Sequence, residues 1–240
     1  MIPPVLERGE LEVLGRMPWA SNQTYMARLC LDEPGEGGVP EKQSALAVYK
    51  PRRGERRLWD FPDGTLCQRE VASRLLSEAL GWAIVPPTLL RPGPLGEGMV
   101  QLFVDHDPEN HYFTLRDAYP ERFRQFALFD VVANNADRKS GHCLLDGDGH
   151  LWGIDHGVTF HRSVKLRTVI WDFEGERIDD DLAADLARAD AGFDGELGER
   201  LAGLLAPAEI DAARRRLGWL LSRRIFPSPM TDYPYPWPMV

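Results

Sequence analysis

The chain has 240 residues, of which 43% are hydrophobic, so it can bury a sizeable core in one large domain or in two small lobes that share a cleft. Its formal net charge of −9 argues against a nucleic-acid partner, since that affinity depends largely on Lys and Arg side chains that neutralise phosphates. The N-terminus has no basic segment followed by an apolar run, and no apolar run reaches about 18 residues, so we expect a cytoplasmic protein without a transmembrane segment.

The first patterned residues predict a small β-sheet. Apolar and polar side chains alternate on both sides of a polar turn in residues 10–31, which is typical of two strands. After a loop rich in Gly and Pro, the run SALAVYKP predicts a third strand. This strand ends at Lys50, because Pro51 stops it.

One helix and two further strands complete this half of the chain. From Glu70 to Leu80 the apolar residues fall at helical spacing, and Gly81 is a typical helix end. Residues 82–90 and 96–105 predict two strands, separated by a segment of turn residues. The N-terminal half is therefore expected to hold about five strands and one helix.

The second half of the chain has mostly helical patterns. The segment PERFRQFALFDVVANNA, residues 120–136, predicts a helix that leads the chain to Asp137. Residues 142–155 predict a hairpin, with two apolar runs around an Asp-Gly-Asp-Gly turn. Helical spacing returns in residues 178–224, and the Pro-rich tail 226–240 cannot continue a helix.

The charged residues follow the order of the parts of a kinase active site. Kinases use a catalytic-loop Asp, a metal-binding Asn five residues later, and a strand that ends in Asp-Phe-Gly, whose Asp holds magnesium. Here Asp137 precedes the hairpin, His142 stands five residues later, and Asp155-His156-Gly157 ends the hairpin. Upstream, Lys50 ends the strand AVYK as the phosphate-anchoring lysine does in V-A-I-K, and Glu70 opens the helix where a lysine-orienting glutamate belongs.

The runs AVYKP, REVASRLLSEALGWAIVPPT, MVQLF, NNADRKSGH and GIDHG resemble the phosphatidylinositol 3/4-kinase-like branch of the kinase fold. Within it they resemble uncharacterised bacterial proteins, and more distantly the HipA-type kinases. The resemblance implies an α+β, two-lobed protein-kinase-like fold, with a small β-rich N-lobe that contains one helix and a compact, mostly helical C-lobe. We place the N-lobe at residues 1–104, the C-lobe at 105–225 and a Pro-rich tail at 226–240.

The resemblance also implies roles for the charged residues. Lys50 would bind the ATP phosphates, and Glu70 would be its ion-pair partner. Asp137 would position or deprotonate the acceptor, and Asp155 would be a metal ligand. Together they imply a cofactor set of ATP with Mg or Mn.

Two further segments are implied to hold the nucleotide. The place of the adenine hinge, where backbone groups would pair with the base, is taken by Gln101, Leu102, Phe103 and Val104. The segment SNQTY falls where the phosphate-covering loop belongs, but it departs from G-x-G-x-x-G. Phosphate binding there would use backbone N–H groups of Ser21, Asn22 and Thr24, and the Ser21 and Thr24 hydroxyls.

His142 departs from the pattern, because kinases have Asn at this position. Magnesium prefers oxygen ligands, whereas imidazole suits manganese, iron or zinc. His142 is therefore interpreted in three ways: as a ligand of manganese, as a contact to a phosphate, or as the mark of a lost second metal site. As a ligand in an exposed loop, its preference for manganese should fade below a pH of roughly 6.5.

Simpler interpretations exist for each residue taken alone. Asp155 is consistent with a turn, Lys50 with a solvated strand end, and Glu70 with the acidic preference of a first helical turn. For the whole chain, we expect transfer of a phosphoryl group from ATP to an unidentified protein or small-molecule acceptor. The alternatives are a nucleotide-binding pseudokinase that acts as a regulatory or interaction module, and an enzyme that transfers an adenylyl group.

Overall fold

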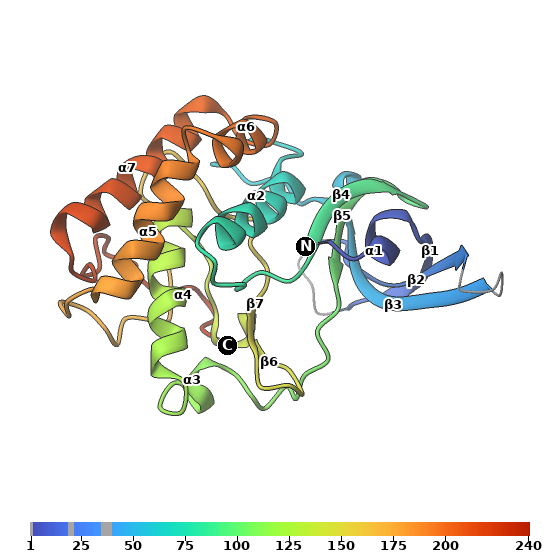
Figure 1. Ribbon diagram of the computed structural model, residues 1–240, viewed down its shortest axis with the longest axis horizontal. Coiled ribbons are helices and arrows are strands. Elements are labelled where there is room, and N and C mark those ends of the chain that lie inside the picture. Colours follow the sequence, from blue (N-terminus) through green and yellow to red (C-terminus); the bar gives the residue numbers. More distant parts are fainter. Residues whose placement is uncertain (1, 19–21, 35–39) are drawn as a thin grey trace.

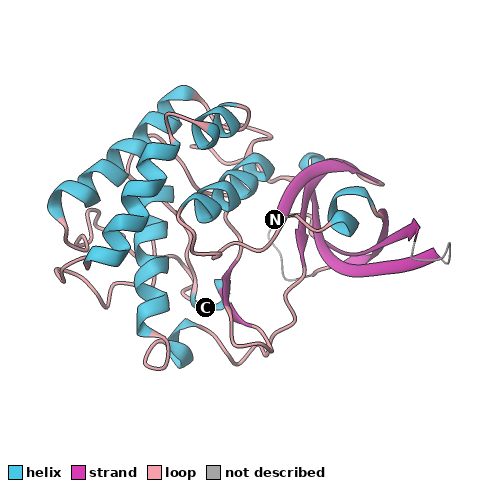
Figure 2. Cartoon of the chain, in the orientation of Figure 1, coloured by secondary structure: helices cyan, strands magenta, loops and turns pink. Residues whose placement is uncertain are grey.

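The computed structural model of the chain describes residues 2–18, 22–34 and 40–240, and its elements form two lobes (Figure 1). Strands gather in one lobe and most helices in the other, as Figure 2 shows by colour. The expected β-rich N-terminal lobe and helical C-terminal lobe are therefore confirmed. The boundaries at residues 104 and 225 remain predictions.

The N-terminal lobe is a five-stranded antiparallel sheet with the order β1-β2-β3-β5-β4. Its strands are β1 (Glu10–Arg16), β2 (Tyr25–Pro34), β3 (Pro40–Pro51), β4 (Thr88–Gly93) and β5 (Gly96–Leu102). A short helix, α1 (Pro4–Arg8), packs on the sheet and completes a small core that includes Leu6, Leu29, Tyr49 and Val100. Lys50 pairs with Met99 of β5, so the last residues of β3 lie inside the sheet rather than at a free end.

The predicted strands differ from the observed ones mainly at their ends. The strand predicted from residue 82 begins only at Thr88, after Pro86 and Pro87, which have no backbone N–H to pair with a neighbour. The segment predicted as a long turn is mostly strand, because β4 continues to Gly93 and β5 starts at Gly96. Gly96 accepts this tight reversal with a φ of 101°.

The predicted helix of the N-terminal half is α2 (Leu66–Ala79), and it begins one turn earlier than expected. The Glu55 carboxylate accepts hydrogen bonds from the N–H groups of Leu66 (3.1 Å) and Cys67 (2.9 Å). Since these N–H groups have no partner inside the helix, a carboxylate eleven and twelve residues away in sequence stabilises the helix start. Glu70 therefore lies in the second turn and does not open the helix.

Helix α2 packs against the helical lobe. Its side chains Ala72, Leu75 and Leu76 belong to the large core that also holds Phe123 and Phe126. Figure 1 shows α2 between the sheet and the other helices. The helix thus belongs to the first half of the sequence but shares the core of the second.

The helical lobe agrees closely with its predicted pattern. Its helices are α3 (Tyr112–Leu115), α4 (Pro120–Ala133), α5 (Asp180–Gly192), α6 (Glu196–Ala202) and α7 (Pro207–Arg223). The predicted hairpin is formed by β6 (Cys143–Leu145) and β7 (Leu151–Gly153). No helix in the described residues is both long and apolar enough to span a bilayer.

The Pro-rich tail lies against the loop that follows α4. The Met239 carbonyl accepts a hydrogen bond from the N–H of Ser140 (2.8 Å), and the Pro234 carbonyl accepts one from the N–H of Thr168 (3.0 Å). As expected, the tail is not helical. The first bond ties it to the predicted catalytic loop, and the second to the segment that follows the hairpin.

Candidate functional site

Two neighbouring cavities lie where the sheet meets the hairpin. The larger encloses about 170 Å³, and the smaller encloses about 70 Å³. Asn22, Lys50 and Asp155 line both of them, while Glu70 and Asp137 line only the smaller one. The larger cavity is also lined by the predicted residues Thr24, Gln101, Leu102, Phe103 and Val104.

Lys50 of the sheet forms ion pairs with two carboxylates outside it. Its Nζ lies 2.7 Å from Glu70 Oε1 and 2.7 Å from Asp155 Oδ1. The other oxygen of Glu70 accepts a hydrogen bond from the N–H of His156 at 2.8 Å. Burial alone would lower the pKa of Lys50, but the two carboxylates outweigh it and hold the pKa above its ordinary value. The expected contact between Lys50 and Glu70 is present, and Asp155 joins it.

Asp155 has a backbone conformation that is unusual for a residue with a side chain. Its φ is 63°, in the left-handed region, which costs on the order of 1–3 kcal/mol unless the surroundings enforce it. Lys50 holds the pKa of the Asp155 carboxyl well below its usual range. The side chain is 47% exposed, so an ionised carboxylate faces the cavities and is open to a ligand.

His142 lies beside Asp155, with 3.5 Å between its Nε2 and Asp155 Oδ2. It ends a short 3-10 turn (Ser140–His142), and its side chain is only 13% exposed, so the expectation of an exposed loop position is wrong. Burial lowers the pKa of His142 to about 4, and the ring is therefore neutral at neutral pH. The loss of manganese preference expected near pH 6.5 accordingly moves to lower pH.

The tautomer of His142 limits how it can bind a metal. The N–H of Lys139 donates to His142 Nδ1 at 3.4 Å, so the neutral ring carries its proton on Nε2, the atom that faces Asp155. Binding a metal through Nε2 requires this proton to move to Nδ1. Without that move, Nε2–H is a donor to an anionic oxygen.

Asp137 lies on the wall of the smaller cavity, and its backbone is held in place by Asn135. The N–H of Asp137 donates to Asn135 Oδ1 at 3.0 Å, and Lys139 Nζ lies 3.4 Å from Asp137 Oδ2. Burial raises the pKa of Asp137 to about 6, although the charge of Lys139 opposes this shift. A carboxyl with such a pKa can accept a proton near neutral pH.

The hinge segment offers fewer free backbone groups than its sequence implied. The N–H of Leu102 donates to Pro87 (2.9 Å), and that of Phe103 donates to Leu46 (3.0 Å). The N–H of Val104 has no partner among the residues that the structure describes, whereas the Val104 carbonyl is 2.9 Å from His106 Nδ1. Of these three N–H groups, only that of Val104 remains to bind a base.

The side chain of Gln101 has an internal partner, since its Nε2 donates to the Thr88 hydroxyl at 2.8 Å. In the phosphate-covering segment, Ser21 lies outside the described residues. The Asn22 Oδ1 accepts a hydrogen bond from the N–H of Arg56 (2.8 Å), and the Thr24 hydroxyl donates to the Asn22 carbonyl (3.4 Å). Among the described residues, which leave out 19–21, the Asn22 amide N–H groups have no partner, while the Thr24 hydroxyl donates to the Asn22 carbonyl.

Several residues near the cavities were not predicted. His106, Leu144 and Ile154 line the larger cavity, and Lys139 contacts Asp137. Lys139 could have been found from its place two residues after Asp137. Leu144 and Ile154 have no chemical signal in the sequence, because apolar lining residues look like core residues, and His106 lies two residues beyond the predicted hinge.

The acidic and imidazole groups are too few to hold a metal by themselves. Among the residues that the structure describes, no group of three or more His, Cys, Asp or Glu side chains is arranged around one point. Asp155 and His142 supply at most one carboxylate and one imidazole. Such a pair fits an ion whose other ligands are phosphate oxygens and waters, as is usual for magnesium in nucleotide sites.

Known proteins resemble the chain in sequence and in fold. The phosphatidylinositol 3- and 4-kinase family matches residues 91–189. The protein Rv2133c of Mycobacterium tuberculosis is 41% identical over an alignment of 269 residues, which covers 98% of this chain and 94% of that protein. Phosphatidylinositol 4-kinase gamma 4 of Oryza sativa subsp. japonica is 28% identical over 197 residues, which cover 69% of this chain and 34% of the plant protein.

A solved structure supports the fold. The proinflammatory kinase CtkA of Helicobacter pylori superimposes with a TM-score of 0.52 and 11% identity, over 91% of this chain and 94% of that protein. At this identity the likeness concerns the fold alone, and it confirms the two-lobed kinase-like architecture. By its family match and its relatives, the chain belongs to the phosphatidylinositol 3- and 4-kinase-like family.

Proposed function

We propose that this protein transfers a phosphoryl group from ATP, with a divalent metal, to a hydroxyl group of a protein or small molecule. One observation carries the proposal. Lys50 Nζ lies 2.7 Å from both Glu70 and Asp155 on a wall that the two cavities share. A cation held between two carboxylates at a cleft is the arrangement with which kinases place the phosphates and the metal.

The larger cavity suits the base and the ribose of the nucleotide. The N–H of Val104, which has no partner in residues 2–18, 22–34 and 40–240, can donate to an adenine ring nitrogen, and Val48 and Leu144 give the cavity apolar walls. The phosphates then extend toward Lys50, Asn22 and the second cavity. This direction follows from charge, because Lys50 is the cation that both cavities share.

Asp155 and His142 are the residues that would hold a magnesium or manganese ion. The ion would neutralise charge on the transferred phosphate and align it. Asp155 is suited to this role because it is ionised and about half exposed. Lys50 would then exchange part of its contact with Asp155 for a phosphate oxygen.

Asp137 is the proposed base. The acceptor oxygen attacks the γ-phosphorus, the bond from that phosphorus to the β–γ bridging oxygen breaks, and ADP leaves. The proton of the acceptor hydroxyl goes to Asp137 Oδ, whose raised pKa of about 6 suits this transfer. The smaller cavity brings Asp137, Lys50 and Asp155 together on one wall.

Calorimetric titration with ATP, in the presence of manganese or magnesium, tests the proposal. We expect Asp155→Asn to weaken metal-dependent ATP binding without unfolding the protein. Asp148→Asn is the matched control, since Asp148 is exposed at the tip of the same hairpin. Equal affinities in Asp155→Asn and wild type would contradict the proposal.

The mass added to an acceptor separates the rival functions. A phosphoryl group supports the proposal, and the much heavier adenylyl group identifies an adenylyl transferase. Metal-dependent ATP binding without turnover on any hydroxyl acceptor, including water, identifies a pseudokinase.

A further inference from the structure

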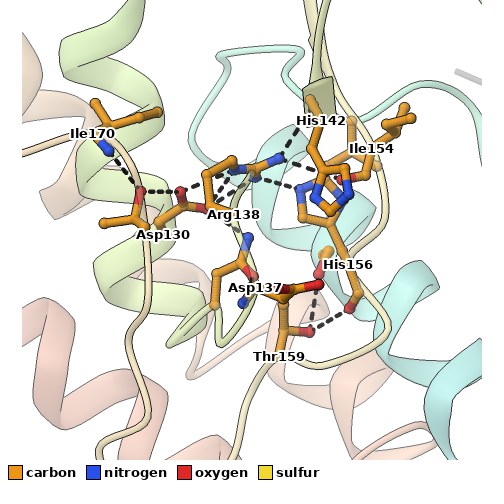
Figure 3. A network of polar contacts seen from close by, with 12 residues as sticks. Asp130, Asp137, Arg138, His142, Ile154, His156, Thr159 and Ile170 are labelled. Atoms are coloured by element: carbon orange, nitrogen blue, oxygen red, sulfur yellow. Dashed lines mark hydrogen bonds and ion pairs between the residues drawn. The ribbon is translucent and has the colours of Figure 1, made fainter. Parts of the chain in front are cut away.

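Arg138 is a fully buried arginine whose five N–H groups all have partners (Figure 3). Its Nε donates to Asp130 Oδ2 at 3.0 Å, and one N–H of NH2 donates to Asp130 Oδ1 at 2.9 Å. The other N–H of NH2 points to His156 Nε2 at 2.7 Å. NH1 donates to the carbonyls of His142 and Ile154, each at 3.3 Å. A guanidinium has five donors in one plane, and this site uses all of them.

These partners surround the residues that the proposed chemistry needs. Ile154 and His156 are the neighbours of Asp155 on either side, and the His142 carbonyl also accepts the N–H of Ile154 at 3.0 Å. One side chain therefore restrains the backbone of His142 and both flanks of Asp155. The left-handed φ of Asp155, 63°, needs such restraint to persist.

The same network extends to the proposed base. Asp130 Oδ1 also accepts a hydrogen bond from Asn135 Nδ2 at 2.9 Å, and Asn135 Oδ1 accepts the N–H of Asp137 at 3.0 Å. Asp130 is on α4, so the core of the helical lobe anchors the whole chain of contacts. Figure 3 shows Arg138 between Asp130 on one side and His142, Ile154 and His156 on the other.

We propose that Arg138 is a positioning residue that holds His142, Asp155 and, through Asp130 and Asn135, Asp137 in one geometry. The inference rests on the proposed function for its catalytic meaning, but the restraint on the backbone of residues 154–156 does not. Arg138 itself lines neither cavity, so it acts through its neighbours.

Lysine cannot replace arginine in this role. Its ammonium group keeps the positive charge opposite Asp130, but its three donors diverge from one atom and cannot reach two carbonyls, a ring nitrogen and a carboxylate together. Arg138→Lys therefore keeps the positive charge opposite Asp130 but loses the contacts to His142, Ile154 and His156. A second variant, Asp130→Asn with Arg138→Met, removes both charges, which avoids leaving one ion buried without a partner.

The test compares these two variants with wild type and with Arg124→Lys. Arg124 lies on the same helix as Asp130, pairs with Glu176 and lines neither cavity, so it controls for the loss of any guanidinium. Three quantities are measured: amide hydrogen exchange of residues 154–156, the rise in Tm on adding manganese with a non-hydrolysable ATP analogue, and kcat with KM for ATP turnover.

We expect Arg138→Lys to speed exchange in residues 154–156 more than in α7, and to lose most of the ligand-induced rise in Tm. Turnover should fall on the order of 10²-fold, mainly in kcat, as misplaced catalytic groups do. The double variant should show the same changes as Arg138→Lys, and Arg124→Lys should behave as wild type.

Two other outcomes would contradict part of the argument. If Arg138→Lys speeds amide exchange equally in residues 154–156 and in α7, and leaves the ligand-induced rise in Tm and kcat intact, Arg138 has a purely structural role. A wild type without ligand response would contradict the proposed function instead, and the exchange data would still decide whether Arg138 restrains residues 154–156.

Discussion

The two lobes contribute to the site in different ways. The sheet lobe has a small core and supplies a cation, Lys50, from its third strand. The helical lobe has the larger core, which includes α2, and supplies Glu70, Asp137 and Asp155. The carboxylates are thus held by one packed unit, and Lys50 reaches them from the other. The ion pairs of Lys50 with Glu70 and Asp155 therefore join the two units at the site.

The attachment of α2 to the helical lobe explains this division. The side chain of Arg69 is 1% exposed and donates to Glu209 Oε1 of α7 and to the Thr159 carbonyl, each at 2.6 Å. The indole of Trp82, just after α2, donates to Asp185 of α5 at 2.6 Å. Glu70 therefore has a fixed place relative to Asp155, and movement of the sheet displaces Lys50 rather than the carboxylates.

The largest effect is expected when the polar contacts of Arg69, which anchor α2 to the helical lobe, are removed. Arg69→Met leaves the Glu209 carboxylate without its partner in a mostly buried place, which typically costs about 3–5 kcal/mol of unfolding free energy. Urea denaturation measures this loss. Arg214→Met removes an exposed ion pair between α7, the helix that carries Glu209, and Asp194, which follows α5, and should leave the midpoint unchanged. A midpoint for Arg69→Met that equals wild type would show that α2 is held by apolar packing alone.

The next effect concerns the contact between the lobes. Lys50→Ala should lower turnover on the order of 10²–10³-fold, as the loss of one electrostatic group at a transferred phosphate does. Because Lys50 and Glu70 are in direct contact, the losses in the double variant with Glu70→Ala should be smaller than their sum. Steady-state kinetics on the three variants measures the coupling.

Lys42→Ala is the matched control for Lys50, since Lys42 is an exposed lysine on the same strand. It should leave turnover unchanged. If the losses at Lys50 and Glu70 simply add, the pair does not act as a unit across the boundary.

A smaller effect is expected when the pH is lowered, because turnover then depends on the protonation of Asp137 in the helical lobe. Asp137 must be ionised to accept a proton, and its pKa is raised to about 6. Turnover should therefore be constant above this pH and fall about tenfold for each unit below it. The pH profile of kcat measures this limb, and Asp137→Asn should remove it along with most activity. A limb near pH 4 in wild type would indicate that Asp137 is not the base.

The smallest effect is expected at His142. If its imidazole binds the metal, manganese should support turnover better than magnesium, and His142→Asn should shift the ratio several-fold toward magnesium. With a pKa lowered to about 4, the ring stays neutral, so the preference should persist at pH 5.5. Equal ratios in wild type and variant would favour Nε2–H as a donor to a phosphate.

The sequence alone predicted on which strands and loops the functional residues lie. Strand periodicity and the stop at Pro51 placed Lys50 near a strand end, and helical spacing before Asp137 with the hairpin after it placed Asp155 at a second end. These features arise from backbone preferences and side-chain periods within a few residues, which a sequence reports directly.

The tertiary structure decided what depends on distant residues. Glu55 moved the start of α2 to Leu66, and the N–H groups of Leu102 and Phe103 are taken by bonds to Pro87 and Leu46. Burial set the pKa of His142 and of Asp137, and four residues, Asp130, His142, Ile154 and His156, supply partners for the five donors of Arg138. Burial and charge at a point are sums over groups that are remote in sequence, so local patterns carry no record of them.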